Sequence, residues 1–176
     1  MSKERNGKKK LTVQMMVILA MMIALEVVLS RWLTIWVSDN LKFAFNFVPV
    51  AVVAYLYGPF ASLLVAAVGD LIGSLLYAVG PYFPGFTVTA ALTGLCFGLF
   101  LHNKRNFWRI LISVVIIQVV LTVFLDSLWF MICYGTPYFA SVLTRTIKAG
   151  VMVVVQCLTL VLILPIMERI KKQLKL

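Results

Sequence analysis

The sequence predicts an all-α integral membrane protein, a bundle of six transmembrane helices. Hydrophobic residues make up 62% of the 176 residues and charged residues only 12%, whereas soluble domains are about 45–50% apolar and about 25% charged. The mean hydropathy is +1.03, and apolar runs long enough to cross a bilayer alternate with short turns. A chain of this length fits one compact membrane domain, so we expect no separate soluble catalytic domain.

The first predicted helix follows a basic tail. Residues 1–10 read MSKERNGKKK, and an apolar run covers residues 11–30. The hydrophobic region of a secretory signal is shorter, about 7–15 residues, and about 20 residues are enough to span the hydrocarbon core. We therefore expect a retained first helix in a membrane domain of residues 11–168, followed by a basic C-terminal segment of residues 169–176.

Turn signals separate the remaining apolar runs. Glycine, proline and polar residues, which favour turns, gather in GP at 58–59, GPYFPGFT at 80–87, HNKRN at 102–106 and YGTPY at 134–138. The predicted helices between these turns cover residues 43–57, 60–79, 86–101, 107–133 and 139–167. No convincing internal repeat relates them, so the inverted-repeat signature of many secondary carriers is missing.

The basic residues predict the orientation in the membrane. Twelve of the sixteen Lys and Arg residues lie in the tail, in or just after the loop at 102–106, and in the C-terminal segment. A six-helix arrangement brings these segments to one side, which the positive-inside rule makes cytoplasmic. We expect a multi-pass protein of a prokaryotic plasma membrane with both termini in the cytoplasm. No nucleic-acid-binding motif accompanies the net charge of +10, so we expect no nucleic-acid partner.

Ionisable residues inside the predicted spans are the main functional signal. Asp70 lies about 15 Å along its helix, close to the bilayer midplane, and Arg145 and Lys148 share one face of the last helix at i, i+3 spacing. Charges inside a span usually face a cavity or the bundle interior. They predict a cavity, open to the outside, for an anionic solute; the alternative is internal ion pairing, for example of Asp126 with Arg145, and both can coexist. Further ionisable residues in the outer half are Glu26 and Arg31.

Aromatic residues support the cavity. Tyr82, Phe83 and Phe86 lie on a loop stiffened by Pro81 and Pro84. Rings beside a polar cavity can sandwich a planar heteroaromatic group. The alternative for the tyrosine, and for the tryptophans at outer helix ends, is the interfacial aromatic belt. Those tryptophans are Trp32, Trp36 and Trp129.

Small residues recur at four-residue spacing, which lets helix backbones approach closely. Gly69 with Gly73, and Gly94 with Gly98, are expected to pack the bundle, whereas Ala20 and Ala24 either do the same or offer a smooth face to a partner. Cys96, Cys133 and Cys157 are far apart and predict apolar fillers.

Missing motifs limit the chemistry. The chain has no phosphate-binding loop, so we expect no ATP hydrolysis by the chain itself. His102 is its single histidine, which excludes a histidine-based metal site and a Ser-His-Asp set. We expect neither a cofactor nor enzyme activity, and a catalytic interpretation would rest on Asp70 and Asp126 alone.

Four stretches resemble a known family. They are VVLSRW at 27–32, FNFVPVAVVAYLYGP at 45–59, GDLIGSLL at 69–76 and GPYFPGFTVTAALTGL at 80–95. With the six-span layout they resemble the substrate-binding S-components of energy-coupling factor (ECF) vitamin transporters, and the PYFPGFT loop is similar to the folate-specific branch. The resemblance implies capture of a vitamin from outside and import powered by a separate transmembrane subunit and two ATPase subunits. It also implies that Ala20 and Ala24 dock onto that transmembrane subunit.

Folate fits the residue inventory. Asp70 or Asp126 could accept paired hydrogen bonds from the pterin, and the aromatic loop could stack on its rings. Arg31, Arg145 and Lys148 could bind the tail carboxylates, and we expect the loops at 31–42 and 80–87 to close over the ligand. The candidate substrate-binding residues are Arg31, Asn46, Asp70, Tyr82, Phe83, Pro84, Gly85, Phe86, Thr87, Asp126, Trp129, Arg145 and Lys148.

Three alternatives remain open from the sequence. The first is an S-component for another vitamin, such as thiamine or riboflavin. The second is a stand-alone secondary carrier that uses Asp70 as a proton site, against which the lack of repeats counts. The third is a small membrane enzyme, which lacks an evident nucleophile and base.

Overall fold

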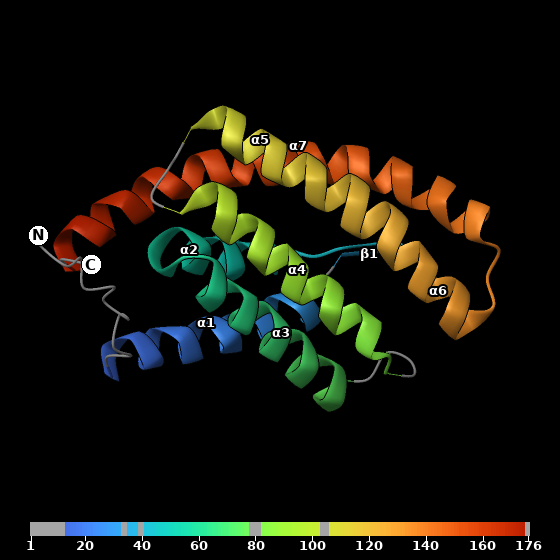
Figure 1. Cartoon of the computed structure of the whole chain (residues 1–176), viewed down its shortest axis with the longest axis horizontal. Coiled ribbons are helices and arrows are strands. Elements are labelled where there is room, and N and C mark those ends of the chain that lie inside the picture. Colours follow the sequence, from blue (N-terminus) through green and yellow to red (C-terminus); the bar gives the residue numbers. More distant parts are fainter. Residues whose placement is uncertain (1–12, 33–34, 39–40, 78–81, 103–105, 175–176) are drawn as a thin grey trace, which may run out of the picture.

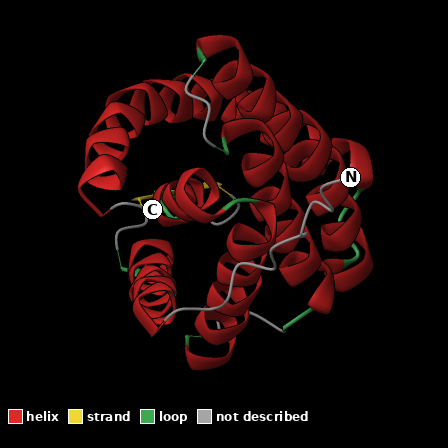
Figure 2. Cartoon of the chain, turned by 60° about the vertical axis from the view of Figure 1, so that its left-hand side comes forward, coloured by secondary structure: helices red, strands yellow, loops and turns green. Residues whose placement is uncertain are grey.

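The computed structural model describes residues 13–32, 35–38, 41–77, 82–102 and 106–174. Within these ranges the chain is a bundle of helices with a two-stranded hairpin (Figures 1 and 2). The predicted all-α membrane bundle is confirmed, since the described helices match the six predicted spans to within a few residues at most ends. The basic tail, Pro81 and two loop cations, Lys104 and Arg105, lie outside the described residues.

The helices follow the predicted order. They are α1 (Val13–Arg31), α2 (Phe47–Tyr57), α3 (Pro59–Leu76), α4 (Pro84–Leu101), α5 (Phe107–Ile116), η1 (Ile117–Leu125), α6 (Asp126–Tyr134) and α7 (Tyr138–Leu174). The π-helical segment η1 joins α5 and α6 into one 28-residue span, Phe107–Tyr134. Among the described residues, five helices are long and apolar enough to cross a membrane, and α2, with 11 residues, is a shorter apolar helix.

Local chemistry explains the helix ends. Gly58 ends α2 with a φ of 92°, a conformation that glycine adopts without steric cost, and Pro59 begins α3. Pro84 likewise begins α4, and Gly135 ends α6 in the left-handed region. These are the residues that the sequence marked as turn signals.

A short antiparallel hairpin follows α1. Strand β1 (Ile35–Ser38) pairs with β2 (Leu41–Phe43), with Ile35 opposite Phe43 and a register shift between residues 36 and 38. The sequence analysis did not anticipate it within the predicted loop at 31–42. The hairpin leads the chain back to the start of α2.

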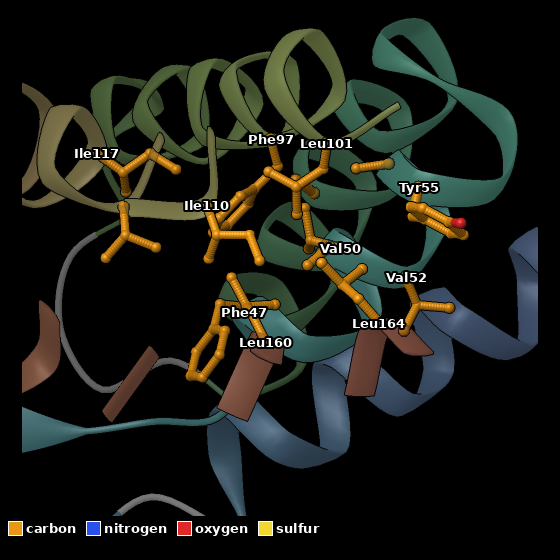
Figure 3. Close-up of a cluster of buried hydrophobic side chains, with 14 of the residues drawn as sticks. Phe47, Val50, Val52, Tyr55, Phe97, Leu101, Ile110, Ile117, Leu160 and Leu164 are labelled. Carbon is orange, nitrogen blue, oxygen red and sulfur yellow. The ribbon is translucent and has the colours of Figure 1, made fainter. Parts of the chain in front are cut away.

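The apolar core surrounds α2. This helix packs against α1, α3, α4 and α7, which explains why nearly all its residues are buried although it is short. Its side chains cluster with residues of three other helices (Figure 3), namely Leu101 at the end of α4, Ile110 at the start of α5 and Leu164 in the second half of α7. The core therefore fills the end of the bundle where α1 begins and α7 ends, at the left of Figure 1. Charged residues inside the spans, such as Arg31 at the end of α1 and Arg145 near the start of α7, lie toward the other end.

Close approach of α3 and α4 depends on glycine. Ser62 donates a hydrogen bond of 2.7 Å to the carbonyl of Gly94, and a Cβ at Gly94 would overlap the backbone of α3 at Ser62. A Cβ at Gly98 would likewise overlap Pro59. The Gly94 and Gly98 pair thus has the packing role expected from its spacing.

Candidate ligand-binding site

A cavity of about 540 Å³ opens beside the core, and core residues such as Phe47 and Met152 form part of its lining. This volume lies within the range of about 300–1,000 Å³ that is typical of small-molecule sites. Side chains from α1, α2, α3, α4, the span containing η1, and α7 line it. Its charged lining residues are Glu26, Arg31, Asp70, Asp126, Arg145 and Lys148.

The wall formed by α1 rests on glycines of α3. Glu26 is only 2% exposed, and a Cβ at Gly69 would overlap its carboxylate. One turn further, the position of a Cβ at Gly73 lies 3.2 Å from Nε of Arg31. Gly69 and Gly73 therefore make room for polar side chains of the neighbouring helix, and these side chains reach the cavity as a result.

A chain of hydrogen bonds orients Asp70. Thr87 Oγ1 donates to Asp70 Oδ2 at 2.8 Å, and the Tyr82 hydroxyl lies 3.1 Å from Thr87 Oγ1. This chain connects the residues before α4 to the middle of α3. The Asp70 carboxylate is thus held in a fixed direction at the cavity wall.

The basic corner of the cavity combines an ion pair with an aromatic contact. Arg145 Nη1 lies 3.7 Å from Asp126 Oδ2, with the two side chains 11% and 20% exposed. The same guanidinium lies 4.2 Å from the centre of the Phe130 ring, and Lys148 lines the cavity one turn further along α7. The ion pair named as an alternative to the cavity is therefore present together with the cavity.

Aromatic rings form a continuous wall beside this corner. Phe83 and Phe86 meet edge to face at 6.2 Å between ring centres, and Phe86 meets Phe130 in the same way at 5.4 Å. Phe130 stacks on Tyr134 at 5.1 Å. All four rings line the cavity, as does Tyr82, so the wall suits a flat aromatic guest.

The π-helical segment determines which residues of this span face the cavity. Besides Ile117, its lining residues recur at every fourth position: Gln118, Thr122, Asp126, Phe130 and Tyr134. In an α-helix of 3.6 residues per turn, four residues turn about 40° too far, so four such steps would drift by about 160°. In a π-helix each hydrogen bond spans one more residue than in an α-helix, so each turn contains more than four residues. Four residues of a π-helix therefore cover less than a full turn. The π-helical residues thus offset the α-helical drift and keep all five side chains on one face.

Most predicted binding residues line the cavity. They are Arg31, Asn46, Asp70, Tyr82, Phe83, Phe86, Asp126, Arg145 and Lys148. The other predicted residues are Pro84, Gly85, Thr87 and Trp129.

These other residues support the wall from behind. Gly85 is buried, and a Cβ there would come within 2.6 Å of Cδ2 of Trp129. Trp129 donates from its indole nitrogen to Thr89 Oγ1 at 3.0 Å and packs against Phe83 at 5.5 Å. Thr87 acts through Asp70, as described above, and Pro84 begins α4.

Several polar lining residues were not among the predicted binding residues. Glu26 was noted in the sequence as a charge in the first span without a role. The neutral lining residues that were missed are Ser30, Ser74, Thr89, Thr93, Gln118, Thr122, Thr136 and Gln156. The available signal was polar spacing, since Gln118 and Thr122 stand eight and four positions before Asp126 in an apolar run.

The alanine pair of α1 lies away from the cavity. Ala20 and Ala24 are both exposed, one turn apart. Their face is therefore open to lipid or to a partner.

A bundle of apolar helices around a charged, aromatic-walled cavity defines a membrane protein that binds a small solute. The chain matches the family model "ECF transporter, substrate-specific component" over residues 14–170. It belongs to this family, so it is the substrate-binding membrane component of a transporter and not an enzyme. The resemblance found in the sequence is confirmed.

Known relatives agree with this assignment. The chain is 37% identical over 154 residues to "Folate transporter FolT" of Leuconostoc mesenteroides, covering 84% of this chain and 82% of the relative. It is 33% identical over 141 residues to the protein of the same name from Clostridium novyi, covering 80% and 81%. The solved structure "Crystal structure of FolT bound with folic acid" matches with a TM-score of 0.77 and 30% identity, covering 83% of this chain and 91% of that one.

Proposed function

We propose that this protein captures folate from outside the cell and delivers it to an ECF module for import. The observation that carries the proposal is a cavity lined by carboxylates, cations and aromatic rings, with Glu26 and Asp70 on α1 and α3 and with Arg145 and Lys148 on α7. Folate has a flat pterin with hydrogen-bond donors, a benzoyl ring and a tail with two carboxylates. The names of the relatives and the folic acid in the similar structure support the same ligand.

The roles of the lining residues follow from their chemistry. Asp70, held by Thr87, and buried Glu26 accept hydrogen bonds from the pterin amino and ring N–H groups. The wall of Phe86, Phe130 and the neighbouring rings stacks on the planar part. Arg145, with Lys148 beside it, binds the carboxylates of the tail.

The transport cycle needs partners. In our proposal the end of the bundle where α1 begins and α7 ends faces the cytoplasm, as the basic segments favour, and the cavity opens at the outer end. Segments 31–42 and 80–87, parts of which lie outside the described residues, close over the ligand. The loaded protein docks through the Ala20 and Ala24 face onto a transmembrane subunit that is driven by two ATPase subunits, and it reorients to release folate.

Ligand binding by the purified protein tests the substrate. The protein is purified in detergent, any bound compound is identified by absorbance and mass, and the stripped protein is titrated with folic acid, thiamine and riboflavin. We expect the purified protein to carry one equivalent of a pterin compound. Of the three vitamins, only folic acid should bind tightly to the stripped protein. Stoichiometric binding of thiamine or riboflavin without folic acid would assign the protein to another vitamin.

Uptake by vesicles tests the need for partners. Vesicles that contain this chain alone should not accumulate folic acid under a pH gradient. Accumulation driven by that gradient would instead support a proton-coupled carrier that uses Asp70.

A further inference from the structure

Two buried glutamines line the cavity and take no part in the ion pair or in the aromatic contacts described above. Gln118 of η1 is 3% exposed and Gln156 of α7 is 4% exposed. Both line the cavity, and the Oε1 atom of each lacks a hydrogen-bond partner among the described residues. A buried amide oxygen without a partner costs free energy, so each atom indicates a partner that the protein itself does not supply.

The two amides lie deeper than the basic corner. Gln118 stands eight residues before Asp126, about two turns, and Gln156 stands eleven residues after Arg145, about three turns. Because the two segments are antiparallel and pack against each other, both displacements lead toward the end of the bundle where α7 ends (Figure 1). The amides thus lie along the part of the cavity farthest from the cations that suit a carboxylate tail.

Amides supply what the carboxylates of the opposite wall cannot. Asp70 and Glu26, when ionised, only accept hydrogen bonds, whereas each glutamine both donates and accepts. Each unpaired Oε1 atom is an acceptor that suits an amino or ring N–H group of a heteroaromatic ring system, and the amide nitrogen beside it can donate to an oxo or ring-nitrogen atom. Met152, which lines the cavity one turn before Gln156 on α7, offers no strong donor.

We propose that Gln118 and Gln156 are specificity-determining residues that hydrogen-bond the neutral heteroaromatic edge of the ligand. This inference rests on the proposed function and adds two residues that hydrogen-bond to the pterin of folate. In the empty protein the two amides leave hydrogen-bonding capacity unused, and the bound ring satisfies it. A ligand without those ring groups leaves the amides unpaired and is rejected.

The test uses Gln118→Met and Gln156→Met, which keep the side-chain volume and remove both polar atoms. Each variant should weaken binding of folic acid and of pteroic acid about 10- to 100-fold, as expected for one lost hydrogen bond in a buried site. Binding of p-aminobenzoylglutamate, which has the tail but lacks the pterin, should stay unchanged. The thermal midpoint of the ligand-free protein should stay the same or rise, because an unpaired amide has been replaced by an apolar group.

A matched control separates this role from a structural one. Ser113 is fully buried, does not line the cavity and donates a hydrogen bond of 2.8 Å to Ile110 O. Ser113→Ala should lower the thermal midpoint and leave all affinities unchanged. If the glutamine variants behave like this control, or weaken p-aminobenzoylglutamate as much as folic acid, the inference is overturned. A wild-type protein that binds no folic acid would overturn the proposed function and this inference together.

Discussion

Replacement of Arg145 by alanine tests how the basic corner recognises the ligand. The Arg145 side chain is 11% exposed, and its guanidinium lies 3.7 Å from Asp126 and 4.2 Å from the centre of the Phe130 ring, so water in its place would compensate poorly for the lost interactions with the ligand. A hydrogen bond to a charged group contributes about 1.5–3 kcal/mol, which corresponds to roughly a 10- to 150-fold change in Kd. Loss of the cation also removes a positive charge that offsets Asp126 beside the tail carboxylates, so we expect a loss near the upper value for folic acid.

A comparison of folic acid with pteroic acid shows whether Arg145 acts on the glutamate tail. Pteroic acid lacks the glutamate, and its Kd should change less than threefold in Arg145→Ala, measured by tryptophan fluorescence quenching or calorimetry in detergent. The double variant Arg145→Ala/Asp126→Asn should recover part of the lost folic acid affinity, because a carboxylate that repels the tail is removed. Arg169→Ala, at the other end of α7, serves as the control. Equal losses for folic acid and pteroic acid would show that Arg145 acts through the structure of the corner and not on the tail.

Three further predictions concern glycine packing and partner docking. Gly69→Ala should displace Glu26, weaken folic acid binding and lower the thermal midpoint, because overpacking typically costs about 1–3 kcal/mol. Gly98→Ala should lower the midpoint by a few degrees, about 2–4 °C per kcal/mol, without a specific effect on ligand choice. In Gly150→Ala nothing lies within 4 Å of the added Cβ, so this matched control should be neutral or stabilising; destabilisation there would remove the packing explanation. Ala20→Trp should spare folic acid binding and abolish uptake by cells that contain the complete transporter, and unimpaired uptake would contradict docking through this face.

The helices could be predicted because their signals are local. Apolar runs of sufficient length determine the spans, and Gly58, Pro59, Pro84 and Gly135 mark ends that the structure confirms. The charged lining residues could be predicted for a related reason. A carboxylate such as Asp70 is costly in lipid, so its presence in an apolar run already indicates a cavity or an ion pair.

Other features depend on tertiary structure and give no local signal. Neutral polar residues such as Gln118 and Gln156 are 38 positions apart in the sequence, and only the packing of η1 on α7 brings them to one cavity. The spacing of Gly69 and Gly73 suggested close helix packing, but it does not reveal that the neighbour filling the space is the Glu26 carboxylate. The hairpin of β1 and β2 is too short and too irregular to show a clear alternating pattern.

The π-helical segment links the chemistry of the cavity to the number of residues in the chain. If a residue were deleted between Ile117 and Leu125, the segment could continue as an ordinary α-helix. Gln118 and Phe130, twelve positions apart, would then be one position closer, a separation only about 20° beyond three full α-helical turns, so both could still face one ligand. The π-helical segment therefore accommodates an extra residue, and relatives are expected to differ here by single-residue insertions and deletions that leave the two ends of this cavity wall in register.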